Sequence, residues 1–245
     1  MEAIRAFWWQ DSVKAPGGNW GDLLTPLLID HFTDMHARWV PVEEADFIGV
    51  GSILEHIPPG WEGVIAGAGR LIWDSPLDID QAKILALRGP LSARGVPGDY
   101  ALGDPGLLAN ELAPIKAKKY DIGIVPHWSD NRLSTDPRFT KFGNHKVIQF
   151  NQDPLTIVRT IGECRKIVSS SLHGLIVADS YGIPRRFEYA PSLDTEGGMF
   201  KFNDYSLSIN LKLEIGELQT AHRYTVEDRQ HELWDVWRCL GQWLS

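Results

Sequence analysis

Apolar and polar positions alternate along this chain in short blocks, and the pattern predicts an α/β fold. Strand-like apolar runs recur at residues 3–9, 46–50, 63–66, 84–87, 120–125, 147–150, 165–168 and 185–189. Between several of them lie helical patterns, of which the clearest are 22–32 and 154–161, the second behind the capping residue Asp153. Strands that alternate with helices form parallel sheets whose two faces are covered.

The pattern also divides the chain into two predicted halves. Residues 113–119 carry three lysines and precede a new strand, so we predict one domain at 1–118 and a second at 119–245. The closing segment, 226–244, repeats apolar residues at helical spacing. We expect this segment to pack back on the first half, and a helix lying on a membrane surface is the alternative.

Small and polar residues follow nearly every predicted strand. Ligands bind outside the carboxyl ends of the strands in open parallel sheets. The sequence therefore predicts that one edge of each sheet collects Asn19, Asp22, Ser52, Arg88, His127 and His173.

One stretch, residues 166–179, carries the strongest functional signal. It reads as a short buried strand that runs through three serines into an apolar helix, which Gly182 and Pro184 bring to an end. Ser171 is the predicted N-cap, and His173 lies in the first turn. Backbone N–H groups, serine hydroxyls and an imidazole at a helix N-terminus predict a site for phosphate or carboxylate.

Charge and composition exclude some classes of protein. The net charge of -8 argues against a nucleic-acid-binding surface, which needs a basic face. No apolar run approaches the length of a membrane span and the first residues do not resemble a signal peptide, so we expect a cytoplasmic protein. Cys164 and Cys239 lack metal-ligand spacing and are expected to be unpaired thiols. The 10 tryptophans would suit sugar stacking, although core or pocket-wall positions are favoured.

Two motifs point to cofactor or metal chemistry but are incomplete. Gly49-Val-Gly51 and Gly67-Ala-Gly69 are each half of a dinucleotide fingerprint, and we interpret them as close backbone approaches. Asp78 and Asp80 match the D-x-D of metal-dependent glycosyltransferases. Capping of a helical segment at 81–83 is the favoured interpretation, and we expect no metal site.

Several polar residues have two open interpretations. Arg88 suits bidentate binding of an anion or a salt bridge between the halves. Asp22 is a ligand contact or a helix cap, and His127 is a ligand contact or a satisfied loop histidine. Asp104, in Leu102-Gly-Asp-Pro-Gly106, is interpreted as a structural Asx-turn residue.

Taken together, these segments resemble the polysaccharide pyruvyltransferase family, in its exopolysaccharide ketal-pyruvate transferase branch. The matching pieces are Asn19-Trp-Gly-Asp22, Gly49-Val-Gly-Ser-Ile53, Gly67-Ala-Gly69, Leu87-Arg-Gly-Pro-Leu-Ser92, Leu102-Gly-Asp-Pro-Gly106, Val125-Pro-His127, Ser169-Ser-Ser-Leu-His-Gly-Leu-Ile-Val-Ala-Asp179 and Ile183-Pro184. Lys201-Phe-Asn-Asp-Tyr205 resembles a further element of this branch. The order and spacing hold over residues 19–206.

The resemblance implies an α/β, GT-B-like fold in which two Rossmann-like halves with parallel sheets face a central cleft. It also implies transfer of a pyruvyl group from phosphoenolpyruvate to two hydroxyls of a saccharide, with release of phosphate and no further cofactor. The expected partners are phosphoenolpyruvate and a lipid-linked or polymeric saccharide. A lipid-linked acceptor would place the protein at the inner face of the cytoplasmic membrane.

The chemistry of this donor assigns roles to the candidate residues. The carbon that bears the phosphate becomes electrophilic when the neighbouring methylene is protonated. We expect His173 to protonate it or to stabilise the departing phosphate, and Asp22 or His127 to accept a proton from the sugar. The residues expected to bind the donor are Arg88, Ser170, Ser171, Leu172, Lys201, Asn19 and Ser52.

One departure from the family pattern affects the donor site. Some family members carry Arg at the position of Ser171, so the cation must come from Arg88, Lys201 or Arg70. A glycosyltransferase that uses a nucleotide sugar and a catalytically silent carbohydrate-binding relative are the alternative functions, because the same scaffold would serve either.

Overall fold

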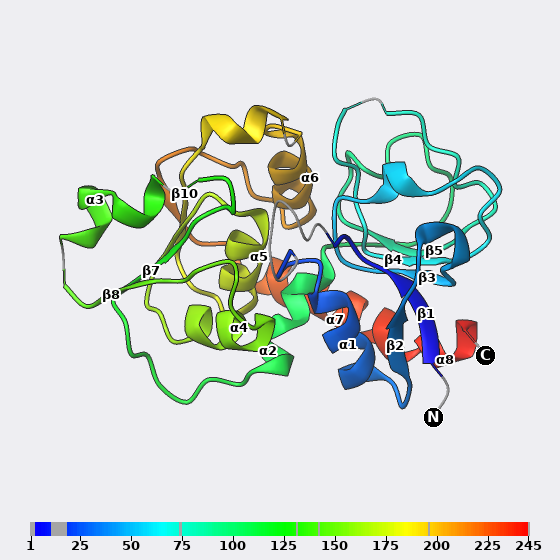
Figure 1. Cartoon of the computed structure of the whole chain (residues 1–245), viewed down its shortest axis with the longest axis horizontal. Coiled ribbons are helices and arrows are strands. Elements are labelled where there is room, and N and C mark those ends of the chain that lie inside the picture. Colours follow the sequence, from blue (N-terminus) through cyan, green and yellow to red (C-terminus); the bar gives the residue numbers. More distant parts are fainter. Residues whose placement is uncertain are drawn as a thin grey trace.

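The first half of the chain forms a six-stranded parallel sheet (Figure 1). The structure, a computed structural model, describes residues 3–10, 19–73, 75–130, 132–141, 143–195 and 197–244. The spatial order of the strands is β2 (His36–Trp39), β1 (Ala3–Phe7), β3 (Phe47–Ile48), β4 (Val64–Ala66), β5 (Lys83–Leu87) and β6 (Ala101–Leu102). Each neighbouring pair is parallel.

The two faces of this sheet have separate hydrophobic cores. Ala6 and Phe47 point into the larger core, where α1 (Leu24–Phe32) and α7 (Arg223–Arg238) pack. Their chain neighbours Phe7 and Ile48 point to the other face, as the two-residue period of a strand requires. That face is covered by turns and by the 3-10 helices η1 (Val42–Glu44) and η2 (Leu54–His56). Both faces are buried, as predicted, but α-helices pack against only one of them.

The second half forms a five-stranded sheet. Its order is β11 (Leu218–Gln219), β10 (Arg185–Phe187), β9 (Ile167–Ser169), β7 (Ile122–Val125) and β8 (His145–Val147), in which β10 and β11 are antiparallel and the other pairs are parallel. Two helices, α4 (Pro154–Gly162) and α5 (Leu172–Ser180), cover one face. A smaller core with η4 (Leu133–Thr135) and α3 (Pro137–Thr140) covers the other.

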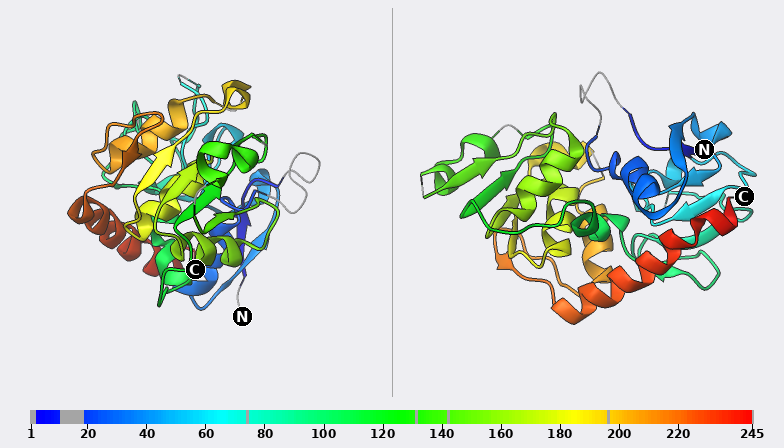
Figure 2. Two further views of the ribbon diagram at one scale, coloured as in Figure 1. Left: turned by 90° about the vertical axis from the view of Figure 1, so that its left-hand side faces the viewer. Right: turned by 90° about the horizontal axis from the view of Figure 1, so that it is seen from below.

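Three groups of elements join the halves. η3 (Pro105–Leu108) and α2 (Ala109–Leu112) lead out of the first half, and the predicted boundary at residue 118 falls between α2 and β7. η5 (Pro191–Thr195) leads to α6 (Phe200–Ser208), which lies beside the first half (Figure 1). At the end of the chain α7 runs beneath both halves (Figure 2) and contacts α1, β5 and β6, followed by α8 (Leu240–Trp243).

All eight predicted strands are present, with ends that differ by one or a few residues. Three short strands, β2, β6 and β11, were not predicted. β2 is largely exposed at the sheet edge, and β6 and β11 have two residues each. None of the three therefore shows the apolar run of a buried strand. The helical segment predicted at 81–83 is wrong, because Lys83 begins β5. No described helix combines the length and apolar character needed to cross a membrane.

In both sheets the strand order reverses at one point. The chain leaves β1 for β2 on one side and then returns to β3 on the other; likewise it leaves β7 for β8 and returns to β9. In open parallel sheets such a reversal opens a crevice beyond the carboxyl ends of the two central strands. The loops after β1, β3, β7 and β9 are therefore the places where a ligand site is expected.

Candidate functional site

A pocket of about 290 Å³ lies where these four loops meet. Both halves of the chain contribute to it. Its walls are Trp9, Asn19, Asp22, Ser52, Ile53, His56, Leu71, His127, Trp128, Ser171, Leu172, His173, Thr195 and Lys201. Eight residues predicted from the sequence are therefore brought together, namely Asn19, Asp22, Ser52, His127, Ser171, Leu172, His173 and Lys201. Two others, Arg88 and Ser170, are absent from these walls.

The N-terminus of α5 forms the floor on the side of the second half. Ser171 is the N-cap residue, as predicted, but its hydroxyl makes no capping hydrogen bond. The neighbouring hydroxyls are used inside the protein. Ser169 Oγ donates to Val125 O at 2.8 Å and accepts from the Ser171 N–H, and Ser170 Oγ accepts from the His127 N–H at 2.9 Å. Ser171 is thus the one of these three serines whose side chain both lines the pocket and is left for a ligand.

His173 is held by close packing rather than by hydrogen bonds. A Cβ atom on Gly21 would lie 1.9 Å from Nδ1 of His173, so glycine is required for the loop to cross the imidazole. Trp20 meets the same ring edge to face, with the ring centroids 6.0 Å apart. Burial, with the nearby charges of Arg88 and Lys201, lowers the pKa of His173 to about 3. The imidazole is therefore neutral at pH 7.

The pKa of Asp22 is shifted in the opposite direction, above its ordinary value. Burial, together with the charge of Asp104, raises the pKa of Asp22 to about 8, although Lys201 and Arg88 oppose the shift. The Trp9 backbone N–H and the Asn19 side-chain amide also donate to its carboxyl, the second at 3.1 Å. The Asp22 carboxyl is mostly protonated at pH 7 and can donate a proton.

Lys201 brings positive charge into the pocket from α6. Its side chain is buried, and its charge acts on the pKa of Asp22, His127 and His173 together. Burial and the Lys201 charge lower the pKa of His127 to about 3. Nδ1 of His127 lies 2.7 Å from Ser129 Oγ, which fixes the ring.

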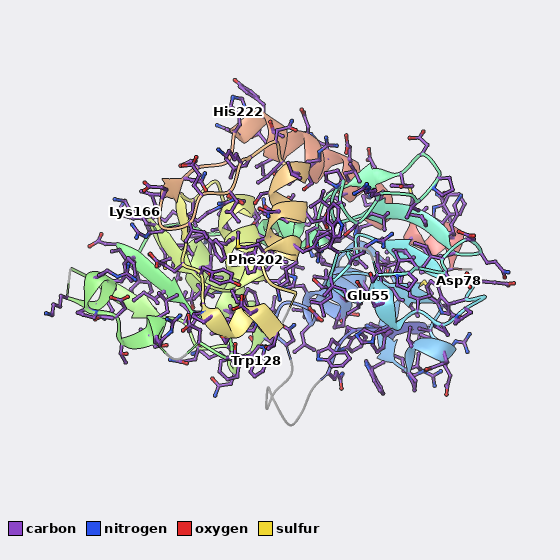
Figure 3. All side chains as sticks on the ribbon, turned by 90° about the horizontal axis from the view of Figure 1, so that it is seen from above. Glu55, Asp78, Trp128, Lys166, Phe202 and His222 are labelled. Atoms are coloured by element: carbon purple, nitrogen blue, oxygen red, sulfur yellow. The ribbon has the colours of Figure 1, made fainter. Side chains whose placement is uncertain are left out.

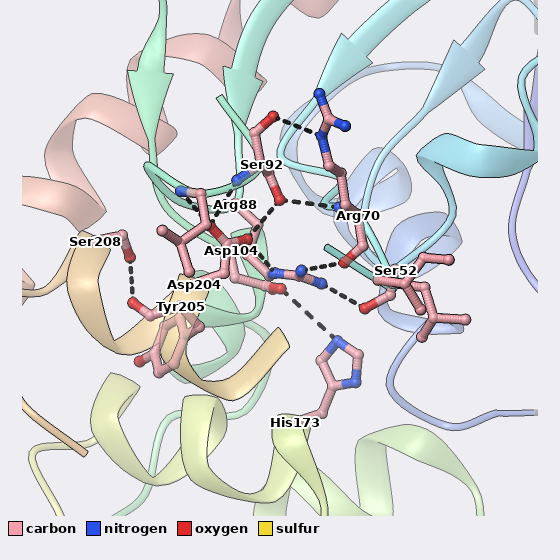
Figure 4. A network of polar contacts seen from close by, with 12 residues as sticks. Ser52, Arg70, Arg88, Ser92, Asp104, His173, Asp204, Tyr205 and Ser208 are labelled. Atoms are coloured by element: carbon pink, nitrogen blue, oxygen red, sulfur yellow. Dashed lines mark hydrogen bonds and ion pairs between the residues drawn. The ribbon is translucent and has the colours of Figure 1, made fainter. Parts of the chain in front are cut away.

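Arg88 stands behind the pocket in a buried ion pair. Its Nε donates to Asp204 Oδ2 at 2.9 Å, and both side chains are fully inaccessible to solvent. The two terminal nitrogens donate to Ser52 Oγ and to the Arg70 carbonyl oxygen. Figure 4 shows this network, in which Asp204 also accepts from Ser92. Of the two interpretations left open by the sequence, the geometry is that of the salt bridge between the halves, with Ser52 between the guanidinium and the pocket.

Arg70 does not supply a pocket cation either. Its guanidinium donates to the backbone carbonyls of Ser75, Ser92 and Arg94. Lys201 is therefore the cationic side chain among the described pocket walls.

Asp104 has a second feature beyond the predicted Asx-turn. Its Oδ1 accepts from the Gly106 N–H at 2.8 Å, as the turn requires. Its Oδ2 is buried, has no hydrogen-bond partner in the described part of the chain and faces Nε2 of His173 at 3.9 Å (Figure 4). Burial is the main reason why the pKa of Asp104 rises to about 6.

The remaining motifs fit structural roles. A Cβ on Gly67 would meet Pro105, and one on Gly69 would meet the Arg88 guanidinium, so the interpretation as close backbone approaches is confirmed. Figure 3 shows Asp78 at the outer end of the first half, far from Trp128 at the junction. Among the described residues no group of three or more His, Cys, Asp or Glu side chains could hold a metal.

The sequence missed several pocket walls. His56, Leu71 and Thr195 carried no recognisable signal, and Ile53 lies in the quoted Gly49–Ile53 motif but was assigned no role. Trp9 and Trp128 were covered only by the general expectation that the tryptophans occupy core or pocket-wall positions. Asp204, the partner of Arg88, lies in the quoted Lys201–Tyr205 element but was assigned no role.

Comparison with known proteins agrees with the resemblance noted in the sequence. A model of the family described as polysaccharide pyruvyl transferase matches residues 79–187. The succinoglycan biosynthesis protein ExoV of Rhizobium meliloti (strain 1021) is 26% identical over 217 residues, which cover 85% of this chain and 66% of that protein. The uncharacterized protein L143 of Acanthamoeba polyphaga mimivirus is 34% identical over 114 residues, which cover 42% of this chain and 38% of the relative. The chain thus spans two thirds or less of the length of these relatives.

Proposed function

This chain belongs to the polysaccharide pyruvyl transferase family, and on that premise we propose that it transfers a pyruvyl group from phosphoenolpyruvate to two hydroxyls of a saccharide. The product is a cyclic ketal, and phosphate is released. We further propose that the two halves are the Rossmann-like domains of a GT-B arrangement, with the pocket in the cleft between them. The observation that carries the proposal is a buried pocket in which a protonated carboxyl, neutral imidazoles and a cation converge at both topological reversals.

The charges of the pocket suit an anionic donor. Lys201 lines the wall, and Arg88 stands behind Ser52. The protonated Asp22 adds no negative charge at neutral pH, because its pKa is about 8. The N-terminus of α5 and the uncommitted hydroxyl of Ser171 can donate to phosphate oxygens. Lys201 thus supplies the cation that the serine at position 171 does not.

Because the pKa of Asp22 is higher than that of His173, we propose that the two residues exchange the roles of acid and base expected from the sequence. From the sequence we expected His173 to protonate the donor and Asp22 to accept a proton from the sugar. With pKa values of about 8 and about 3, Asp22 holds a proton at pH 7 and His173 does not. We therefore assign the protonation of the methylene carbon to Asp22. His173 accepts a hydroxyl proton once the anionic donor has raised its pKa, and the resulting imidazolium hydrogen-bonds the departing phosphate.

The protons balance over the complete transfer. Asp22 gives one proton to the methylene, which becomes the methyl group of the ketal. The first sugar hydroxyl attacks the neighbouring carbon and loses its proton, and the second attacks as the carbon–phosphate oxygen bond breaks. Of the two hydroxyl protons, one restores Asp22 and the other leaves with the phosphate. His127 is the alternative acceptor for either of them.

The acceptor of this reaction is proposed to be a polysaccharide or its lipid-linked precursor. A lipid-linked precursor would bring the protein to the cytoplasmic face of the membrane, where such a substrate is exposed.

The test is a thermal-shift titration with phosphoenolpyruvate beside UDP and UDP-sugars, followed by NMR of phosphoenolpyruvate in D₂O. We expect stabilisation by phosphoenolpyruvate and enzyme-dependent deuterium entry into its methylene group. Stabilisation by the nucleotides alone would instead support a nucleotide-sugar glycosyltransferase.

A further inference from the structure

The tryptophans differ in their relation to the pocket. Trp8, Trp20, Trp61 and Trp237 are buried in the two cores. Trp39, Trp73 and Trp243 are exposed but lie outside the pocket walls. Trp9 and Trp128 line the pocket, one from each half. Trp9 keeps 37% of its surface accessible, so part of its indole is available to a ligand in the pocket.

Two contacts fix the position of Trp9, one made by its indole and one by its backbone. One face of its indole stacks on the imidazole of His56, with the ring centroids 4.8 Å apart and an angle of 21° between the planes. Burial lowers the pKa of His56, which favours the neutral ring at pH 7. The backbone N–H of Trp9 donates to the carboxyl of Asp22. The position of the indole is thereby tied to the proposed acid.

The accessible part of this indole has the chemistry of a sugar-binding surface. The C–H face of a pyranose ring is apolar and packs on an aromatic plane, while its hydroxyls stay directed outward to polar partners. We propose that Trp9 is the stacking platform of an acceptor subsite, on which one sugar ring lies with its pair of hydroxyls toward Asp22 and the donor. Trp128 lines the same pocket from the second half. This inference rests on the proposed function and adds the acceptor end of the same pocket.

The size and polarity of the pocket fit this arrangement. Its volume of about 290 Å³ is at the lower limit of drug-sized ligand sites, which begin at roughly 300 Å³. A three-carbon donor bound by Lys201 and Ser171 and one sugar ring stacked on Trp9 would match that space. Further sugars of a polymeric or lipid-linked acceptor would extend from the open side.

The test uses saturation-transfer NMR with the full chain and methyl glycosides of galactose, glucose and mannose, in the presence of inorganic phosphate. The variants are Trp9→Ala, Trp9→Phe and the control Trp73→Ala, which removes an exposed tryptophan outside the pocket walls. We expect transfer to the ring C–H protons of at least one glycoside. The apparent Kd should weaken roughly tenfold in Trp9→Ala, with partial recovery in Trp9→Phe and no change in Trp73→Ala.

Two results would overturn the inference. One is the absence of transfer to every glycoside with the unaltered protein, and the other is equal binding by Trp9→Ala. Circular dichroism detects a folding defect in Trp9→Ala. In that case the glycoside affinity of Trp9→Phe decides whether Trp9 is the platform. Thermal stabilisation of Trp9→Ala by phosphoenolpyruvate separates the two proposals. If phosphoenolpyruvate stabilises neither protein, the donor assignment fails, whereas the glycoside result still decides the platform.

Discussion

Nε2 of His173 and Oδ2 of Asp104 face each other at 3.9 Å, and neither of these buried atoms has a hydrogen-bond partner among the residues that the structure describes. The distance is too long for a hydrogen bond, yet Asp104 is anchored through its other oxygen to the Gly106 N–H. Buried polar atoms are nearly always satisfied in folded proteins. An exception at this position has a functional explanation. When His173 takes up a proton, the Asp104 carboxylate is in place to stabilise the imidazolium after a movement of about 1 Å.

Replacing Asp104 tests this relationship through the pH dependence of the reaction. The charge of Asp104 raises the pKa of Asp22. Asp104→Asn removes that charge while the side-chain oxygen still accepts from Gly106. The pKa of Asp22 should therefore fall below about 8, and the loss of kcat/KM at high pH should begin at a lower pH. A profile of kcat/KM for phosphoenolpyruvate between pH 6 and 10 measures this, and an unchanged high-pH limb would show that Asp22 is not the group that titrates.

Asp22→Asn should separate chemistry from binding. A positioned acid contributes roughly 10²–10⁴ in rate, so we expect a loss of that size in kcat. The amide keeps the shape of the carboxyl and adds no charge, so thermal stabilisation by phosphoenolpyruvate should persist. Deuterium entry into the methylene group should disappear with the activity. Persistent deuterium exchange in this variant would assign the acid to another residue.

The same variant makes a prediction about stability. The folded-state pKa of Asp22, about 8, lies far above its unfolded value of about 3.9. The unfolded state therefore releases this proton first, and the contribution of Asp22 to stability declines as pH rises from 4 to 8. Asp22→Asn lacks this decline. Urea unfolding at several pH values should show that the free energy of unfolding of the variant rises relative to that of the unaltered protein toward pH 8. A difference in this free energy that stays constant with pH would contradict the raised pKa.

The fold was largely predictable because the strands of a parallel sheet are short continuous apolar runs. The strands Ile122–Val125 and Ile167–Ser169 illustrate this, since Ile124 and Val168 are buried on one sheet face and Val125 and Ile167 on the other. The pocket was predictable in part because loops that follow parallel strands converge. The buried ion pair of Arg88 was not predictable, because its partner Asp204 lies 116 residues away and only the packing of α6 brings the two together. Similarly, the turn motif around Asp104 predicts the bond of one carboxylate oxygen but not what the other oxygen faces.

Gly21 should be intolerant of a side chain for a reason specific to the site. The Cβ of Gly21→Ala would lie 1.9 Å from Nδ1 of His173, so either the loop or the imidazole must move. We expect a large loss of kcat in a protein that still folds. Gly241→Ala, whose Cβ would meet no atom within 4 Å, is the matched control and should keep full activity. Comparable activity in both variants would show that the position of His173 is unimportant.

The Arg88–Asp204 pair should matter mainly for stability and for the joining of the halves. Removing one partner of a buried ion pair costs about 3–5 kcal/mol, because the other charge is left uncompensated. Arg88→Met should lower the free energy of unfolding by that amount. Asp204→Asn on the same background removes the stranded carboxylate and should restore part of the loss. Urea unfolding of the single and double variants measures the coupling, and strictly additive losses would mean that the two residues act independently.

Ser171 should serve the donor rather than the helix. A serine that truly caps a helix contributes about 0.5–2 kcal/mol, but the Ser171 hydroxyl makes no capping bond to α5. Ser171→Ala should therefore leave the unfolding midpoint nearly unchanged while it raises the KM for phosphoenolpyruvate. Asp153 provides the reverse control, because its carboxylate accepts from the Thr156 N–H at 2.8 Å and does cap α4. Asp153→Ala should lower stability and leave the KM unchanged. If Ser171→Ala instead behaves like Asp153→Ala, its hydroxyl has a structural role and the anion is held by Lys201 and the backbone alone.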